Sequence, residues 1–464
     1  MNIHFIAIGG SVMHNMALAM VQNGHTVTGS DDEIFEPAKS RLASRGILPE
    51  SYGWFPDKIN SGLDAVILGM HAREDNPELI KAKELGLKIY SFPEYIYEQS
   101  KNKTRVVIGG SHGKTTITAM IMHVLHELGK DFDYMVGAQL EGFETMFRIS
   151  DAPVIILEGD EYLTSTLDKR PKFHLYRPNI ALLSGVAWDH INVFPTFEIY
   201  VDQFRKFINL IEPGGSLVYC ENDEELNRIC PEARKDIKLF PYGIPQHSIN
   251  NGTTAVTFGN AVTEIQVFGK HNLMNLNGAR LVCECLGIAA ADFMKAIAGF
   301  KGASKRLELL VKSEKSAFYK DFAHSPSKLK ATIEAVKEQF PQRELVACME
   351  LHTYSSLNSG FLEQYKGCMH KADKAIVFYS THALEIKKMP PLPENKVKAS
   401  FGREDIMVFT NKGKLVEYLE SLDWKGKNLL MMSSGSFDGL DIKEFAEKMG
   451  GQSITSKYKL GFRQ

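Results

Sequence analysis

Residues 106–116 read Val-Val-Ile-Gly-Gly-Ser-His-Gly-Lys-Thr-Thr, a β-branched run that breaks into a glycine turn. Apolar residues then recur at helical spacing between Ile117 and Leu128, and Gly129 follows them, which predicts an amphipathic helix. Glycines at such a turn let backbone N–H groups converge on an anion, while a lysine can reach the outer phosphates and a threonine hydroxyl can bind Mg²⁺. The stretch therefore predicts a phosphate-binding loop; the alternative is a plain strand-to-helix turn.

The loop is the short form of this motif. The full spacing would place a glycine at position 108, where Ile108 stands, so only Gly110-x-x-Gly113-Lys114-Thr115 is present. A motif this short occurs often by chance. The strand before it and the helix after it are what favour nucleotide binding over a plain turn.

Composition and charge narrow the class of protein. The 464 residues are 44% hydrophobic and 24% charged, which is ordinary for a globular protein, and this length allows two to four domains with a core each. A net charge of −2 predicts no nucleic-acid partner and no anionic membrane partner. The N-terminus has no basic leader and the chain has no run of 18 apolar residues, so we expect a cytoplasmic protein. The six scattered cysteines are predicted to be reduced packing residues.

Residues 2–31 have the layout of a βαβ nucleotide-binding unit, with a strand, a glycine turn, a helix and a second strand. The turn is Gly9-Gly10-Ser11, and Asp31 follows the second strand, where a carboxylate could hold a ribose. The glycine pattern is incomplete, because Ala7 and Val12 occupy positions where a dinucleotide fold would favour glycine. This argues against a dinucleotide-dependent dehydrogenase, which would also leave the phosphate loop unexplained.

Acidic residues follow two apolar strands behind the phosphate loop. The strand at 153–157 runs directly into Glu158-Gly159-Asp160-Glu161, and the strand at 180–184 precedes Asp189-His190. Because the carboxyl ends of parallel strands meet at one edge of a sheet, Glu158 and His190 are candidate Mg²⁺ ligands beside the loop. The alternatives are a solvated acid cluster and a structural Asp–His pair.

Residues 269–275, Gly-Lys-His-Asn-Leu-Met-Asn, are predicted to begin a helix. Asn272 and Asn275 lie one turn apart on one face and could offer a donor and an acceptor to an adenine edge. An ordinary helix start explains the spacing equally well.

A further α/β domain is predicted to begin near Ser304. Short apolar strands alternate there with helices such as the one at 327–339, which is typical of a largely parallel sheet. Asp321-Phe322-Ala323-His324 follows its first strand, where Asp321 and His324 could face a ligand. The loop at 433–439 follows its last strand and is rich in backbone donors. The polar stretch at 98–104 is predicted to be the linker out of the first domain.

Together and in this order, the motifs resemble those of the Mur ligase family, the ATP-dependent amide-forming enzymes of peptidoglycan synthesis. The resemblance covers essentially the whole chain, at residues 9–11, 110–116, 158–161, 189–190, 271–275, 305–308 and 321–326. It implies an α/β fold of three domains. They would be a Rossmann-like UDP-sugar-binding domain at 1–103, a central P-loop ATPase domain at 104–303 and a Rossmann-like peptide-binding domain at 304–464.

The resemblance also implies roles for the residues of the phosphate loop and the acid cluster. Lys114 would cradle the β- and γ-phosphates of ATP. Thr115 and Glu158 would bind one Mg²⁺, and His190 would bind a second that also touches an acyl phosphate.

Residues further along the chain would complete the ATP site. Asn272 and Asn275 would hold the adenine and Asp321 the ribose. Arg306 and His324 would contact the transferring phosphate.

The implied site residues form four sets. The catalytic set is Lys114, Glu158, His190 and His324. The ATP-binding set is Gly110, Ser111, His112, Gly113, Lys114, Thr115, Thr116, Asn272, Asn275, Arg306 and Asp321. The UDP-sugar-binding set is Gly9, Gly10, Ser11 and Asp31, and the metal ligands are Thr115, Glu158 and His190.

Two branches of the family differ in the acceptor. Residues 168–178 and 432–439 resemble the branch that joins UDP-N-acetylmuramate to L-alanyl-γ-D-glutamyl-meso-diaminopimelate in peptidoglycan recycling. The branch that adds L-alanine in de novo synthesis is the alternative, and Ser111, Lys305 and Ser325 depart from residues usual in the family. A catalytically silent nucleotide-binding regulator on the same fold is a third hypothesis.

A tripeptide carries three carboxylates and a distal ammonium, so its site needs counter-charges. The candidates are the cations Lys169, Arg170, Arg177 and Arg403, unless they only brace surface loops. We expect a monomer or a weak dimer.

Overall fold

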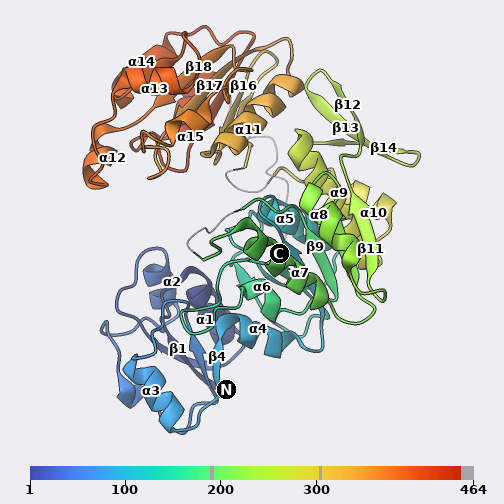
Figure 1. Cartoon of the computed structure of the whole chain (residues 1–464), viewed down its shortest axis with the longest axis vertical. Coiled ribbons are helices and arrows are strands. Elements are labelled where there is room, and N and C mark those ends of the chain that lie inside the picture. The colour runs from blue at the N-terminus through green and yellow to red at the C-terminus, as the bar shows by residue number, and fades with distance from the viewer. Residues whose placement is uncertain (189–192, 303–305, 451–464) are drawn as a thin grey trace, which may run out of the picture. The chain divides into compact units, whose positions relative to one another are not determined.

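The computed structural model describes residues 1–188, 193–302 and 306–450 (Figure 1). Within these residues the chain forms four β-sheets, and its contacts divide it into two compact units. Unit 1 comprises residues 1–245 and 274–297, and unit 2 comprises residues 246–273 and 298–464. Residues 246–273, which the sequence analysis placed in the middle domain, thus group with unit 2. The three domain boundaries stay a prediction.

The first part of unit 1 is a parallel four-stranded sheet in the order β2-β1-β3-β4. Strands and helices alternate as the βαβ pattern predicted: β1 (Asn2–Ile6), α1 (Ser11–Gln22), β2 (Thr26–Ser30), α2 (Ala38–Ser44), β3 (Ala65–Leu68), α3 (Pro77–Glu84), β4 (Ile89–Ser91) and α4 (Phe92–Ser100). The Asn76 side chain accepts the N–H groups of Glu78 and Leu79, so Asn76 caps α3 and Pro77 opens it.

The second part of unit 1 is a seven-stranded sheet in the order β11-β10-β9-β5-β8-β6-β7, parallel except for the last pair. Its elements are β5 (Thr104–Gly109), α5 (Lys114–Glu127), β6 (Asp133–Met135), β7 (Phe147–Arg148), β8 (Val154–Glu158), α6 (Lys172–Leu175), β9 (Ile180–Leu183), α7 (Phe197–Asn209), β10 (Ser216–Cys220), α8 (Glu224–Ile229), β11 (Lys238–Tyr242) and α10 (Ala290–Ile297). Helix α9 (Lys270–Cys285) starts in unit 2 and continues in unit 1.

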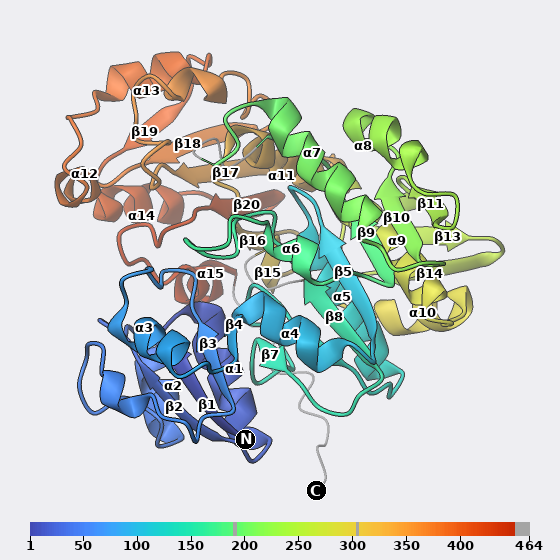
Figure 2. The ribbon, with the colours of Figure 1, turned by 60° about the horizontal axis from the view of Figure 1, so that its bottom comes forward.

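Strand β5 lies in the middle of this sheet, between β8 and β9, and its residues from Arg105 to Gly109 are buried. Helices α6 and α7 lie beside this sheet (Figure 2). Their aromatic side chains pack together: Phe173 of α6 stacks on Phe207 of α7 with ring centroids 4.5 Å apart, and Phe204 lies edge-on to Phe173 at 5.6 Å. A strand covered in this way is an uninterrupted apolar run, which is why the sequence around 106–108 predicted it.

Unit 2 begins with an antiparallel three-stranded sheet of β12 (Gln246–Asn250), β13 (Thr253–Phe258) and β14 (Ala261–Ile265), which the sequence analysis did not predict. A six-stranded sheet follows in the order β15-β16-β20-β17-β18-β19, parallel except for β15. Its elements are β15 (Glu308–Lys312), β16 (Ala317–Asp321), α11 (Pro326–Gln339), β17 (Glu344–Glu350), β18 (Lys374–Phe378), α12 (Thr381–Ile386), α13 (Glu394–Ser400), β19 (Met407–Phe409), α14 (Lys412–Glu420), β20 (Lys427–Met432) and α15 (Ile442–Gly450).

Alternate residues of β17 enter two different cores. Leu345, Ala347 and Met349 pack with residues of α11, whereas Val346 and Cys348 pack with residues of α14 and α15. Helices therefore cover both faces of this sheet, and the prediction of a largely parallel α/β sheet in this region is confirmed.

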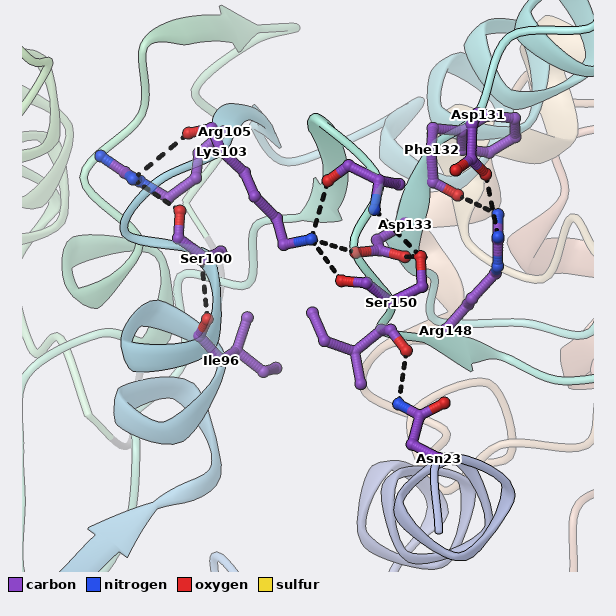
Figure 3. Close-up of polar contacts among 12 residues, drawn as sticks. Asn23, Ile96, Ser100, Lys103, Arg105, Asp131, Phe132, Asp133, Arg148 and Ser150 are labelled. Atoms are coloured by element: carbon purple, nitrogen blue, oxygen red, sulfur yellow. Dashed lines mark hydrogen bonds and ion pairs between the residues drawn. The ribbon is translucent and has the colours of Figure 1, made fainter.

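The stretch predicted as a linker is largely ordered structure. Helix α4 continues to Ser100 and β5 begins at Thr104. Between them, the Lys103 ammonium donates to Asp133 Oδ2 at 2.8 Å and to the carbonyl oxygens of Ser150 and Ala152 at 2.5 and 2.7 Å (Figure 3). The charges are almost fully buried, so this ion pair ties the connection to the seven-stranded sheet.

Arg105 makes a second buried anchor at the start of β5. Its guanidinium donates to the carbonyl oxygens of Ser100, Tyr176 and Arg177 at 2.9 Å each, and to Glu212 Oε1 at 3.0 Å. The side chain is 4% exposed. Arg105 thus joins the end of α4 to the segment that precedes β9.

His174 is buried in the same part of unit 1. Its ring stacks on Phe173 with centroids 4.8 Å apart, and Nε2 lies 2.8 Å from the Gln203 carbonyl oxygen. Burial lowers the pKa of His174 to about 4, and the Gln203 carbonyl offsets this only in part.

The six cysteines all lie within the described residues and are free thiols, as predicted, and five of them are buried. Burial raises the pKa of the Cys230 and Cys283 thiols well above the ordinary value. In the part of the chain that the structure describes, no helix has both the length and the apolar character needed to cross a membrane.

Replacing Arg105 by alanine is expected to destabilise the protein by about 3–5 kcal/mol, because the surrounding carbonyl groups would lose their donor inside the protein. Urea unfolding followed by circular dichroism measures the change. Arg148→Ala is the matched control, since that guanidinium is 43% exposed and pairs with Asp131. The control is expected to cost less than about 1 kcal/mol, and equal losses in the two variants would contradict the role of Arg105.

His174 is expected to make the protein less stable in acid. Its pKa is about 4 in the folded chain against 6.5 for the free group, so the unfolded chain binds the proton first as the pH falls. The contribution is complete above pH 6.5 and is lost progressively toward pH 4, by roughly 2 kcal/mol between pH 7 and pH 5. Urea unfolding at both pH values measures it, and the same acid loss in His174→Gln as in the natural chain would contradict it.

Candidate functional site

The predicted phosphate loop lies at the carboxyl edge of the seven-stranded sheet. Strand β5 ends at Gly109 and α5 begins at Lys114, as the pattern predicted. Gly110 and Gly113 have φ values of +117° and +80°, a backbone region that L side chains rarely adopt. A Cβ at Gly110 would overlap the Ser184 hydroxyl, and one at Gly113 would overlap the Asn275 amide. Both glycines are therefore needed for backbone shape and for space.

The Lys114 ammonium is held inside the loop. It donates to the Gly110 carbonyl oxygen at 2.6 Å and to Glu161 Oε2 at 2.9 Å. Glu161 is almost fully buried, and its other oxygen accepts the Tyr200 hydroxyl at 3.3 Å. A carboxylate from the segment after β8 thus neutralises the Lys114 charge.

Thr115 and Glu158 form a second contact between the loop and the acid cluster. The Thr115 hydroxyl donates to Glu158 Oε1 at 2.8 Å, and Glu158 Oε2 accepts the Gly137 N–H at 2.8 Å. Neighbouring oxygen ligands of an octahedral Mg²⁺ lie about 3 Å apart at Mg–O distances of about 2.1 Å. The two oxygens therefore fit a shared Mg²⁺ ion.

The third predicted metal ligand, His190, lies outside the described residues together with Asp189. Among the residues that are described, no group of three His, Cys, Asp or Glu side chains could hold a metal ion. The structure thus brings together two of the three predicted ligands.

The segment after β9 braces the rest of the loop. Ser111 Oγ donates to the Ala187 carbonyl oxygen at 2.9 Å and accepts its N–H at 2.7 Å, while the Ser184 hydroxyl donates to the Gly109 and His112 carbonyls. Thr116 is buried in α5. These side chains hold the loop in shape through hydrogen bonds.

Three residues of this edge were not chosen as site residues from the sequence. Glu161 belongs to the acid cluster at 158–161, so the sequence pattern could have identified it as a site residue. Tyr200 and Ser184 come from α7 and from the end of β9, and only the fold places them beside the loop. Nothing in their local sequence marks them.

The four residues predicted to bind the UDP sugar lie together at the carboxyl edge of the four-stranded sheet. Asp31 Oδ2 accepts the Gly9 N–H at 2.7 Å, and Oδ1 accepts the Asp32 N–H at 3.0 Å. Burial raises the pKa of Asp31 to about 6, although these two N–H groups favour its charged form. Gly10 precedes α1, which no described side chain caps, so the first turn of α1 presents N–H groups that suit an anion.

In unit 2, a cavity of about 560 Å³ contains two of the predicted ATP-binding residues, Asn272 and Arg306. The Asn272 amide donates to the Phe268 carbonyl oxygen at 3.0 Å, and the Arg306 guanidinium lies 5.4 Å from the centre of the Phe322 ring. Tyr319 and Phe268 add aromatic walls. A cavity of this size can hold a nucleoside.

The Asp321 carboxylate accepts hydrogen bonds from three groups of the surrounding protein. Its carboxylate accepts the N–H groups of Leu307 and Ala323 at 2.5 and 2.7 Å and the Thr332 hydroxyl at 3.4 Å. Burial raises the pKa of Asp321. Oδ2 accepts one of these hydrogen bonds, so a ribose hydroxyl, as predicted, could still donate to it.

His324 lies in the loop after β16. Its Nδ1 is 2.8 Å from the Phe322 carbonyl oxygen, and burial, Lys328 and Arg306 lower its pKa. A neutral imidazole that donates from Nδ1 presents an unprotonated Nε2. In this form His324 accepts a hydrogen bond, and contact with a phosphate would favour its protonation.

Two of the cations considered as counter-charges for a tripeptide are paired with nearby carboxylates. Arg170 pairs with Asp168 at 2.6 Å, and Arg403 pairs with Asp405 at 2.7 Å, each two residues away. These pairs brace loops, which was the alternative interpretation. Arg177 is an exposed residue before the start of β9.

The comparisons with known proteins agree with this geometry. Residues 2–104 match the model described as Mur ligase family, catalytic domain, and residues 108–283 match the Mur ligase middle domain. The chain is 30% identical to the UDP-N-acetylmuramate–L-alanine ligase of Caldicellulosiruptor saccharolyticus, over 80% of this chain and 82% of that protein. It is 25% identical to the UDP-N-acetylmuramate–L-alanyl-γ-D-glutamyl-meso-2,6-diaminoheptandioate ligase of Haemophilus influenzae, over 95% and 98% of the two chains.

A solved structure shares the fold. The UDP-N-acetylmuramate–alanine ligase of Thermotoga maritima has a TM-score of 0.68 and 22% identity, over 97% of this chain and 99% of that one. The phosphate loop, the acid cluster and these matches together lead to one conclusion. The chain belongs to the Mur ligase family, the ATP-dependent ligases of peptidoglycan synthesis that form an amide bond and release ADP and phosphate.

Proposed function

We propose that this chain joins UDP-N-acetylmuramate to the tripeptide L-alanyl-γ-D-glutamyl-meso-diaminopimelate, with ATP and Mg²⁺. The observation that carries the nucleotide chemistry is the double pairing of Lys114 with Glu161 and of Thr115 with Glu158. It aligns a cation, a hydroxyl and a carboxylate at the mouth of a glycine loop, the groups that phosphoryl transfer needs for positioning and charge neutralisation.

The reaction would have two steps. An oxygen of the sugar's lactyl carboxylate attacks the γ-phosphorus of ATP, the bond to the β-phosphate oxygen breaks, and ADP leaves. The peptide amine then attacks the acyl phosphate carbon, inorganic phosphate leaves with the bonding electrons, and the amine loses a proton. Lys114 would exchange Glu161 for the β- and γ-phosphates and stabilise the charge that moves onto them. Mg²⁺, held by Thr115 and Glu158, would supply further neutralisation of phosphate charge.

The release of Lys114 gives Glu161 a role in this scheme. Its carboxylate is buried and needs a partner when the lysine turns to the nucleotide. The Tyr200 hydroxyl, already 3.3 Å from Oε1, would remain as a donor. Glu161 would therefore keep a hydrogen-bond donor while Lys114 contacts the nucleotide.

The proposal for the acceptor is supported by the carboxyl edge of the six-stranded sheet. Glu350 ends β17 and is 2% exposed, and its Oε2 accepts the Ser433 hydroxyl and the Phe437 N–H. Oε1 faces His352, whose Nδ1 lies 3.9 Å away and whose side chain is 37% exposed. A preorganised carboxylate at a strand end suits the distal ammonium of a diamino acid, a group that L-alanine lacks.

The loop that contacts Glu350 contains two residues with unusual backbone angles. Phe437 and Asp438 both adopt left-handed backbone angles, with φ of +49° and +58°. Such angles are costly for residues other than glycine and occur where a loop is shaped for contact. This is the glycine-rich loop whose sequence resembles the recycling branch. L-alanine remains the alternative acceptor, since it is named for two of the three similar proteins described above.

Lys114→Met is expected to lower kcat for ADP formation about a hundred- to a thousandfold or more, because the loop loses its charge at the transferring phosphate. The phosphate released with UDP-N-acetylmuramate, tripeptide, ATP and Mg²⁺ measures it. Glu161 would lose its partner, so the double variant Lys114→Met/Glu161→Gln separates a folding defect from a catalytic one. It should melt like the natural chain and stay inactive. A near-normal kcat in either variant would show that the loop does not serve ATP.

With the other substrates saturating, kcat/KM is expected to favour the tripeptide over L-alanine by well over ~100-fold, which is more than about 2.7 kcal/mol of differential transition-state binding. Phosphate release with each acceptor measures the ratio. A ratio near one, or a preference for L-alanine, would instead identify an alanine-adding ligase.

Glu350→Gln is the control for the proposed ammonium contact. It keeps the shape and an acceptor for Phe437 N–H but removes the charge. The variant should lose kcat/KM for the tripeptide while ADP formation with L-alanine stays unchanged. An equal loss for both acceptors would mean that Glu350 only supports the fold.

A further inference from the structure

Unit 1 contains a second cavity, of about 710 Å³, that the proposed reaction does not use. It lies among β4, α4, α6 and the end of α7. Its volume is within the range of small-molecule sites. Its lining includes Tyr97, Arg177, Leu175, Leu210, Lys206 and Asn209.

This cavity lies at the end of the sheet opposite the phosphate loop. The Arg177 carbonyl is bonded to Arg105, the second residue of β5, whereas the loop follows Gly109 at the other end of that strand. Four residues of extended strand span about 13 Å. A ligand in the cavity would therefore leave the Lys114 site open.

Most charged side chains of the cavity already have partners. Arg170 pairs with Asp168 and with Glu94. Lys206 pairs with Asp202 at 2.9 Å, and Glu98 pairs with Lys101 at 2.7 Å. His174 adds no charge at neutral pH, because burial lowers its pKa to about 4.

Arg177 differs from these side chains. Its guanidinium lies 5.6 Å from the centre of the Tyr97 ring, and among the described residues it forms no ion pair. The backbone has a φ of +41°, a left-handed conformation that is uncommon for arginine. Strained residues that present a side chain to a cavity are a known feature of ligand sites. The cavity thus offers one planar cation without a carboxylate partner.

The remaining lining residues indicate the chemical character of the part of the ligand that does not contact Arg177. Ile89, Tyr90, Leu175 and Leu210 supply apolar and aromatic surface. A guanidinium binds a carboxylate through two parallel hydrogen bonds. A phosphate monoester carries up to two negative charges at pH 7, more than one unpaired arginine neutralises. We propose that this cavity is a second binding site, for a small aromatic carboxylate that pairs with Arg177.

The site would also touch the joint between the two sheets of unit 1. Tyr97 belongs to α4, and its ring also faces the Arg105 guanidinium, 5.3 Å from the ring centre. Arg177 and Leu175 belong to the segment before β9. A ligand that bridges the two would stabilise the joint that Arg105 forms, and its binding would raise the melting temperature by mass action.

The test uses the full chain and 1-naphthoate as the probe, with binding measured by calorimetry and by the melting temperature. The dissociation constant is expected to rise at least tenfold in Arg177→Gln. It should be unchanged in Lys169→Gln, an exposed residue of the same segment outside the cavity. Asn209 also lines the cavity. The Asn209→Trp variant would place a bulky ring there and should abolish binding, which tests the site independently of Arg177. Saturating MgATP should not displace the probe.

Four results would overturn the proposal. They are no binding of 1-naphthoate to the natural chain, equal binding by Arg177→Gln, displacement by MgATP, and equal binding of the neutral analogue 1-naphthalenemethanol. Tighter binding of 1-naphthyl phosphate than of 1-naphthoate would reject the carboxylate assignment. Because none of these measurements depends on turnover, they are independent of the ligase reaction proposed above.

Discussion

The parallel pairing of β5 with β8 and β9 is the constraint on which the site depends. In this register Ile108 lies opposite Glu158, and Gly109 lies opposite Leu183. The glycine loop follows β5, the acid cluster follows β8 and the Ser184–Ala187 segment follows β9. All three therefore lie at the carboxyl edge of the seven-stranded sheet. The contacts of Lys114, Thr115 and Ser111 all follow from this register, and a shift by one residue would turn the Glu158 side chain to the other face of the sheet.

At both ends of β5, largely buried cationic side chains are paired with carboxylates. At its start, Lys103 and Arg105 are paired with Asp133, Glu212 and backbone carbonyls. At its end, Lys114 is paired with Glu161. Charged groups in a protein interior are tolerated only with such partners. The difference is that the pairs at the start join the connection to the sheet, whereas the pair at the end lies in the glycine loop, where we propose that phosphate replaces Glu161.

The six-stranded sheet of unit 2 repeats the use of carboxylates at strand ends. Asp321 gives both oxygens to backbone N–H groups and a hydroxyl, so it serves mainly to shape the loop after β16. Glu350 gives one oxygen to the Ser433–Gly439 loop and leaves the other toward a half-exposed imidazole. Membership of the Mur ligase family accounts for the nucleotide edge of unit 1. The choice of acceptor is the part of the proposal that rests on Glu350.

The sequence alone determined the glycine loop, the position of the acid cluster and the parallel character of the last sheet. Each of these is a local pattern, set by glycine conformation or hydrophobic periodicity within a few residues. The antiparallel strands between Gln246 and Ile265 escaped prediction, because short, half-exposed strands have a weak pattern. Only the tertiary structure shows that Lys114 pairs with Glu161 and that Tyr200 lies at the same edge of the sheet. It also shows that residues 98–104, predicted as a linker, make buried contacts, and that Arg177 lies at the opposite end of the sheet. Those outcomes depend on which strands become neighbours, and residues far apart in the chain decide that.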